Sequence, residues 1–225
     1  MIYNKRRGID LKGVYETKAN YVFDYLKEKI LTAEYKQGES IVISRIAEEL
    51  EISAIPVREA ITRLESEGLV ELTPHKGAQV TTFNSKKISD VLQVRAVLEG
   101  YAAREACGRV DTELLNQLNE VNDVLKMHAL NGEDEKFCNI NKDFHRLLYQ
   151  VSKNKMLFES IFSLWDGGNW SKSLFAYYPE KMMQSVQEHK EIIEAIQNNM
   201  PDTVEKLTRE HKMKHIEFYL ELAKR

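Results

Sequence analysis

The sequence predicts a mainly α-helical protein that begins with a winged helix-turn-helix and continues as an antiparallel helical bundle. Three observations predict this class. Residues 46–64 contain two short stretches of helical periodicity separated by a tight turn. A pair of short extended segments follows directly, which indicates a small β-hairpin wing. From residue 86 onward every segment has the helical period, and no alternating strand pattern occurs.

The first unit is expected to span residues 1–83. Residues 1–13 are polar and basic, and we expect them to be flexible. A first helix is predicted over residues 18–31, where apolar side chains recur every three or four positions. The helix-turn-helix follows, with Ser53 as N-cap of its second helix and Pro56 in the first turn, where a missing N–H does no harm.

The wing is predicted from turn and strand signals after the second helix. Gly68 is expected to close that helix, because a glycine readily adopts the left-handed conformation of a helix end. Residues 69–72 have the composition of a strand, residues 74–77 form its turn, and residues 79–82 form the returning strand.

The second unit is expected to span residues 84–225, with Ser85 capping its first helix. The helical periods that follow predict an antiparallel bundle of about six or seven helices. Helices that face each other across such a bundle can enclose a ligand site.

Composition limits the possible functions. The chain has 225 residues, a hydrophobic fraction of 43% and a formal net charge of −3. No apolar run approaches the roughly 18 residues of a membrane span, and no signal-peptide pattern is present, so we expect a cytoplasmic protein without a membrane partner. Neither half of the chain is basic, and any affinity for DNA must therefore come from local patches.

The second helix of a helix-turn-helix enters the major groove of double-stranded DNA, which is about 12 Å wide. Arg58 lies early in this helix, and its guanidinium can pair bidentately with guanine. The alternative is that Arg58 and Glu59 form a solvated face.

This stretch resembles the DNA-binding domain of GntR-type transcription regulators. The resemblance is carried by four segments, Pro56-Val57-Arg58-Glu59-Ala60, Arg63-Leu64-Glu65, Glu67-Gly68-Leu69-Val70 and Pro74-His75-Lys76-Gly77. It implies operator DNA as a partner and a homodimer on a two-fold operator. The candidate DNA contacts are Ser44, Arg45, Ser53, Arg58, Arg63, His75, Lys76 and Gly77. The chain departs from the family at Ala54 and Ser44, where relatives usually or often carry a basic residue, so the operator of a relative cannot be assumed.

The bundle contains a candidate metal site. Asn141 and His145 are four residues apart and therefore lie on one helix face, while His189 and His211 fall on the last two predicted helices. Three imidazoles and an oxygen side chain form a suitable first shell for zinc or another divalent metal. The alternative for each histidine is an ordinary polar residue of the core or a residue that faces solvent, and we interpret His128 and His215 in this way.

The bundle also resembles the FCD-type ligand-binding domain of the FadR subfamily. The matching segments are Arg95-x-x-Leu98-Glu99-x-x-Ala102-Ala103, Phe144-His145, Ser152-Lys153-Asn154 and Glu188-His189-x-x-Ile192-x-x-Ala195-Ile196. Many members of this subfamily hold a metal with one Asp and three His. Here Asn141 takes the place of the Asp, offering a carbonyl oxygen without charge, so the resemblance implies weaker binding of zinc, nickel or manganese.

Arg95 lies on the apolar face of the first bundle helix, where a buried guanidinium needs an anionic partner. Glu99, four residues later, is the structural candidate. The family motif implies instead that Arg95 meets the carboxylate of a small effector.

Together these features predict a metabolite-responsive transcription regulator, most often a repressor in this family, rather than an enzyme. One alternative is a dimeric DNA-binding regulator whose C-terminal domain is degenerate and binds no ligand. Another is a hydrolase with a zinc ion on His145, His189 and His211, but the sequence has no H-E-x-x-H motif and no evident general base beside these histidines.

Overall fold

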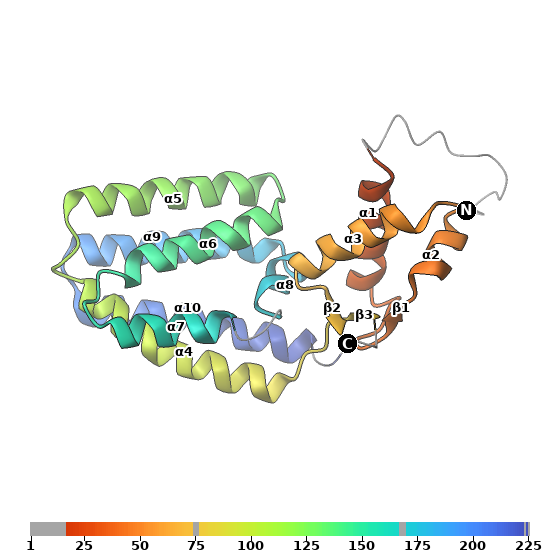
Figure 1. Cartoon of the computed structure of the whole chain (residues 1–225). Coiled ribbons are helices and arrows are strands. Elements are labelled where there is room, and N and C mark those ends of the chain that lie inside the picture. The colour runs from red at the N-terminus through yellow and green to blue at the C-terminus, as the bar shows by residue number, and fades with distance from the viewer. Residues whose placement is uncertain (1–16, 74–76, 167–169, 223, 225) are drawn as a thin grey trace. The chain divides into compact units, whose positions relative to one another are not determined.

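The structure is a computed structural model that describes residues 17–73, 77–166, 170–222 and 224. The chain divides into two compact units, Met1–Val80 and Thr81–Arg225 (Figure 1). The division falls three residues before the boundary expected from the sequence. Phe83 accordingly belongs to the core of the second unit, where its ring contacts Tyr177 and Tyr219. The predicted flexible segment 1–13 lies outside the described residues.

The first unit is a winged helix-turn-helix. Its described elements are α1 (Lys18–Leu31), β1 (Ser40–Ile41), α2 (Ile43–Glu49), α3 (Ala54–Ser66), β2 (Val70–Thr73) and β3 (Gly77–Val80). Helix α3 packs against both α1 and α2. The core of the unit includes Val22 and Leu26 from α1, Ile46 from α2, and Val57 and Leu64 from α3.

Two helix ends shape the motif. Helix α3 closes with Gly68 at a φ of 72°, and the backbone N–H groups of Gly68 and Leu69 donate to the carbonyls of Glu65 and Leu64. This is the hydrogen-bond pattern of a Schellman motif, as the sequence predicted from the glycine. Helix α2 ends in the same way, with Glu51 at a φ of 54° in place of glycine. The tight turn between α2 and α3 depends on that left-handed residue.

The wing contains one strand more than predicted. Strands β2 and β3 form the expected antiparallel hairpin, with Val70 opposite Val80 and Thr73 opposite Gly77. Their bounds differ from the prediction, because β2 begins one residue later and β3 begins at Gly77, two residues before the predicted strand 79–82. Strand β1 adds to the free edge of β3, with Ser40 opposite Gln79, so the sheet has the order β1-β3-β2. A two-residue strand is too short to have a detectable period, which is why the sequence pattern did not predict it.

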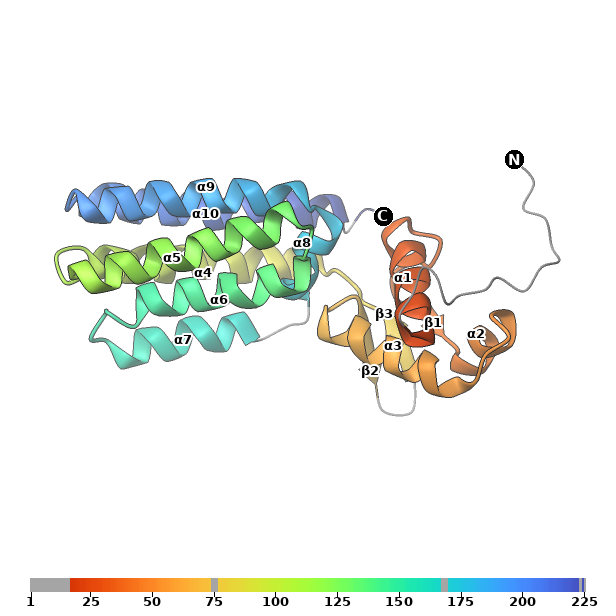
Figure 2. The ribbon, with the colours of Figure 1, turned by 90° about the horizontal axis from the view of Figure 1, so that it is seen from above.

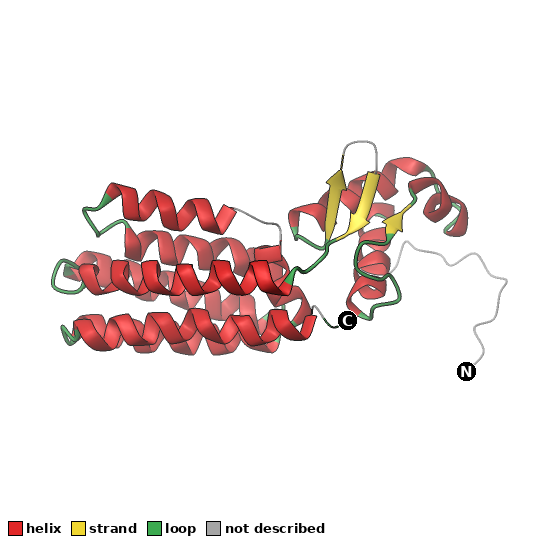
Figure 3. Ribbon diagram, turned by 90° about the horizontal axis from the view of Figure 1, so that it is seen from below, coloured by secondary structure: helices red, strands yellow, loops and turns green. Residues whose placement is uncertain are grey.

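The second unit is a helical bundle, and Figure 3 shows no strand among its described residues. Its helices are α4 (Ser85–Ala106), α5 (Thr112–Leu130), α6 (Asp134–Tyr149), α7 (Lys155–Asp166), α8 (Trp170–Tyr177), α9 (Glu180–Gln197) and α10 (Pro201–Leu222). Helix α4 packs along α10, α10 also contacts α9, and α5 lies between α6 and α9 (Figure 2). The predicted cap is wrong by one residue, because Asn84 accepts from the Lys87 N–H at 2.9 Å and Ser85 is the first helical residue.

Helices α4 and α10 approach closely at Gly100. A Cβ at this position would lie 2.6 Å from Cγ of Arg209 and 3.2 Å from the backbone oxygen of Glu205. Glycine therefore permits the close contact between α4 and α10. Within the described part of the chain, no helix is both long enough and apolar enough to cross a membrane.

Candidate functional site

The exposed face of α3 is the candidate DNA-reading surface. Ile55, Arg58, Glu59 and Thr62 are exposed on it, whereas Val57 and its apolar neighbours face the core. Within the described residues, no hydrogen bond or ion pair engages the guanidinium of Arg58. The Arg58 side chain is thus available for a base or a phosphate.

The other predicted DNA contacts have different surroundings. Ser53 is the N-cap residue of α3, but its side chain makes no capping hydrogen bond. Ser44 and Arg45 are exposed on α2, and Gly77 begins β3 with a φ of 77°. His75 and Lys76 lie outside the described residues.

Arg63 is held against α1. Its guanidinium donates to Oδ1 of Asn20 at 3.0 Å and lies 3.7 Å from the ring centroid of Phe23. These contacts connect α3 to α1, so Arg63 has a structural role within the unit. Arg58 is the better placed of the two arginines to enter a groove.

The predicted metal ligands come together inside the bundle. His145 on α6, His189 on α9 and His211 on α10 are all buried, and each offers a ligand atom within 4.8 Å of the others. Their ring centroids lie 5.0–5.4 Å apart. Asn141, one turn before His145 on α6, is buried as well.

Several polar atoms of this cluster lack partners. Among the described residues, Oδ1 of Asn141, both ring nitrogens of His189 and Nε2 of His211 are buried without a hydrogen bond. An unpaired buried polar atom costs about 1–3 kcal/mol, and a group of them indicates a missing partner such as water, an ion or a ligand. Burial lowers the pKa of His145, His189 and His211 well below the usual value, with nearby positive charges adding to the effect. Neutral imidazoles with free nitrogens are the form that binds a metal, so the donor set fits a divalent ion.

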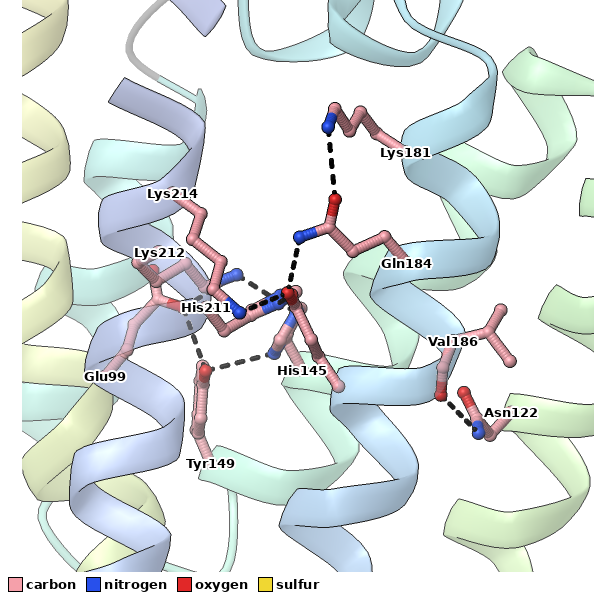
Figure 4. Close-up of polar contacts among 11 residues, drawn as sticks. Glu99, Asn122, His145, Tyr149, Lys181, Gln184, Val186, His211, Lys212 and Lys214 are labelled. Atoms are coloured by element: carbon pink, nitrogen blue, oxygen red, sulfur yellow. Dashed lines mark hydrogen bonds and ion pairs between the residues drawn. The ribbon is translucent and has the colours of Figure 1, made fainter. Parts of the chain in front are cut away.

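Glu188 orients His211. Its Oε2 lies 2.5 Å from Nδ1 of His211, while Gln184 and Lys214 donate to its Oε1 (Figure 4). If Nδ1 of a neutral His211 carries the proton, Nε2 keeps its lone pair and faces the cluster. A carboxylate behind a ligand histidine has the same role in known metal sites.

Glu99 on α4 is the centre of the buried polar network. Its Oε1 accepts from Nε of Arg95 at 2.7 Å and from Nε1 of Trp165 at 2.9 Å. Its Oε2 accepts from the Tyr149 hydroxyl at 2.8 Å and lies 3.2 Å from Nζ of Lys212. Burial alone would raise the pKa of Glu99, but the charges of Arg95 and Lys212 outweigh it and lower that pKa. Arg95 therefore has the structural partner that the i, i+4 spacing predicted.

Lys212 on α10 contacts both Glu99 and the histidine cluster. Its Nζ lies 3.0 Å from Nε2 of His145, whose Nδ1 lies 3.0 Å from the Tyr149 hydroxyl (Figure 4). The lysine is 1% exposed and is paired with the Glu99 carboxylate, and burial lowers its pKa to about 8. Sequence reasoning missed this residue. It follows His211 directly and falls on the inner face of α10, four residues after buried Thr208, which is a detectable signal.

A small cavity adjoins the cluster. It measures about 30 Å³ and is lined by Leu92, Arg95, Asn141, Trp165, Leu174, Phe175, Lys212, His215 and Tyr219. This volume holds one or two water molecules. Two cations, Arg95 and Lys212, line it. Asn141 lines it as well, and its Oδ1 has no hydrogen-bond partner among the described residues. His215, which the sequence left among ordinary histidines, is half-buried in this wall.

Comparisons with known proteins agree with both units. Residues 18–80 match the family described as bacterial regulatory proteins, gntR family, and residues 90–213 match the FCD domain. The HTH-type transcriptional regulator YdhC of Bacillus subtilis is 25% identical over 206 residues, covering 90% of this chain and 92% of YdhC. The HTH-type transcriptional repressor RspR of Escherichia coli is 21% identical over 193 residues, covering 84% and 83%.

The solved structure of E. coli McbR/YncC has the same fold. It superposes with a TM-score of 0.60 at 22% sequence identity, covering 92% of this chain and 99% of that one. The family matches cover both units of the chain, and the relatives align across most of its length. The chain therefore belongs to the GntR family of bacterial transcription regulators and, with its FCD domain, to the FadR-type subfamily.

Proposed function

We propose that this regulator is a homodimeric repressor whose operator binding is controlled by a small carboxylate held in the helical unit. The observation that carries the proposal is the small pocket lined by Arg95 and Lys212, beside the unpaired polar atoms of Asn141 and the histidines. Glu99 supplies one negative charge against the two cations. A monoanionic effector would bring this part of the pocket to neutrality, which favours a carboxylate over a neutral or cationic ligand.

The small volume of the cavity supports coupling between effector and DNA. A space for one or two waters cannot admit a metabolite unless side chains or helices of the wall move. An effector shifts an equilibrium only if it binds two arrangements with different affinity. A bundle that must open for the ligand meets that condition.

A divalent metal belongs to the same proposal. Asn141, His145, His189 and His211 are the residues that would hold zinc, nickel or manganese. Such an ion would supply positive charge and open coordination positions for the carboxylate. The four side chains carry no charge and would not neutralise the ion. The carboxylate of Glu188 contacts Nδ1 of the ligand His211 and not the ligand atoms that face the ion.

Dimerisation is supported by an exposed apolar stripe on α4. Val94, Val97 and Tyr101 are 50%, 51% and 46% exposed and, at spacings of three and four, lie on one helix face. The opposite face of α4 packs along α10. A second copy covering this stripe would give the two recognition helices that a two-fold operator requires.

The alternatives receive less support. A degenerate, ligand-free bundle leaves the buried unpaired atoms of Asn141, His189 and His211 without explanation. A zinc hydrolase is not favoured, because the relatives above are transcription regulators. We therefore assign no catalytic residue.

Calorimetry with a panel of carboxylic and sugar acids tests the proposal, with the operator first selected from random DNA by the purified protein. We expect one class of acid to bind and to change the operator affinity in a mobility-shift titration. Arg58→Ala serves as control, because it should bind the acid and fail to bind DNA. If no acid binds, or if binding leaves DNA affinity unchanged, the regulatory part of the proposal is wrong.

A further inference from the structure

We propose that Lys212 is a resident cation of the histidine cluster, which competes with a divalent metal for one nitrogen of His145 and must leave when the metal binds. The inference rests on the proposed metal site above. It concerns a residue that lies outside the predicted ligand set. Its consequence is that the wild-type pocket has two alternative cationic forms, one with an ammonium and one with a metal ion.

The geometry makes the two forms mutually exclusive. Nζ of Lys212 lies 3.0 Å from Nε2 of His145, and a metal bound to a histidine nitrogen lies about 2.0–2.1 Å from it. An ion placed along the same lone pair would therefore lie only about 1 Å from the ammonium nitrogen. No arrangement that keeps Lys212 in this position leaves Nε2 available to an ion.

The other nitrogen of His145 offers no alternative. Its Nδ1 lies 3.0 Å from the Tyr149 hydroxyl, which in turn donates to Glu99 at 2.8 Å. The Lys212 ammonium has only protons to give, so Nε2 must accept and Nδ1 must carry the ring proton. A metal at Nε2 would keep this tautomer and the bonds through Tyr149. Only Lys212 has to move.

Lys212 loses favourable contacts when it leaves. It is paired with Glu99 at 3.2 Å, and its Nζ lies 4.8 Å from the ring centroid of Trp165. The ion would also enter beside Arg95, whose guanidinium lies 4.1 Å from that ring. Breaking the ion pair and bringing positive charges together both oppose the metal, so Lys212 should weaken metal binding.

The test compares nickel affinity of wild-type protein and Lys212→Met by calorimetry and by equilibrium dialysis with elemental analysis. Methionine fills a similar volume without charge, and we expect it to bind Ni²⁺ at least about tenfold more tightly than the wild type. Lys206→Met is the matched control, because Lys206 lies on the same helix and is 72% exposed. It should bind nickel as the wild type does. Equal or weaker nickel binding by folded Lys212→Met would overturn the inference.

A second measurement needs no variant of Lys212. In the wild-type protein without metal, the amine of Lys212 is buried and should resist acetylation by acetic anhydride, whereas exposed Lys206 should react. Saturating Ni²⁺ should increase acetylation at Lys212, measured by mass spectrometry, and leave Lys206 unchanged. If Lys212 stays protected while nickel is bound, the two cations do not compete and the inference is wrong.

His189→Ala separates this inference from the proposed site. The double variant Lys212→Met/His189→Ala should lose the tight nickel binding of Lys212→Met, because His189 supplies a ligand and Lys212 does not. If the double variant keeps it, the histidine cluster is not the metal site and both proposals fail. If wild type and Lys212→Met bind nickel equally and both lose it with His189→Ala, only the role of Lys212 is refuted.

Discussion

Replacing Glu99 with Gln should strongly destabilise the helical unit. The carboxylate accepts from or pairs with Arg95, Trp165, Tyr149 and Lys212, and it is fully buried. Its loss leaves the guanidinium of Arg95 and the ammonium of Lys212 buried without an anion. Removing one partner of a buried ion pair costs about 3–5 kcal/mol. For a unit of this size, such a loss lowers the melting temperature by roughly 6–20 °C.

Tryptophan fluorescence during urea unfolding measures this effect in the helical unit alone. Both tryptophans of the chain, Trp165 and Trp170, follow residue 80, so the winged unit contributes no tryptophan signal. Glu105→Gln is the matched control on α4, because its pair with Arg109 at 3.0 Å is partly exposed and worth less than about 1 kcal/mol. If Glu99→Gln lowers the free energy of unfolding by no more than Glu105→Gln does, the central role of Glu99 is refuted.

Three further predictions concern DNA and metal. Arg58→Ala should abolish operator binding, because an early-helix guanidinium contact is worth about 1–3 kcal/mol and a dimer loses it twice. Its circular dichroism spectrum should not change. Operator affinity unchanged within about twofold in a mobility-shift titration would contradict this prediction. His75→Ala or Lys76→Ala should weaken binding evenly across sequences and flatten its salt dependence, as phosphate contacts do, and an altered base preference at an unchanged salt slope would argue against this. Asn141→Asp should raise the metal content measured by elemental analysis. His189→Ala should remove both the metal and the response to effector, while operator binding remains. If the wild type holds no metal when supplied with it and still responds to effector, the metal has no part in the mechanism.

The winged unit could be predicted closely because its turns carry local signals. Gly68 determines the end of α3 through its left-handed backbone, and Gly77 starts β3 in the same conformation. The apolar spacing of residues 18–31 gave the first helix with the bounds that the structure has. Strand β1 was missed because its two residues pair with β3, a segment almost 40 positions away, and no local pattern encodes such a contact.

The candidate site was only half accessible from the sequence. The sequence could predict that His145, His189 and His211 share a site, because the helical period and the family resemblance place each of them on an inner helix face. The network around Glu99 could not be predicted in this way. Its partners Tyr149, Trp165 and Lys212 lie 50, 66 and 113 positions further along the chain, and only tertiary packing brings them to Glu99. A charged residue at a position that the helical period places in the core indicates such a network, because buried charges are rare unless they are paired. Lys212 is an example.

Asn141 and Lys212 are best understood together, through the charge that they give the pocket. By resemblance to the FadR subfamily, an Asp with a divalent ion contributes one net positive charge. In this chain Asn141 is neutral and the Lys212 ammonium contributes the same single charge, with its Nζ 3.0 Å from the histidine that would bind the ion. A carboxylate entering the cavity therefore meets a comparable field whether a lysine or a metal–aspartate pair provides it. The proposed effector class thus depends on the net charge of the pocket, whereas the metal content depends on the competition at His145.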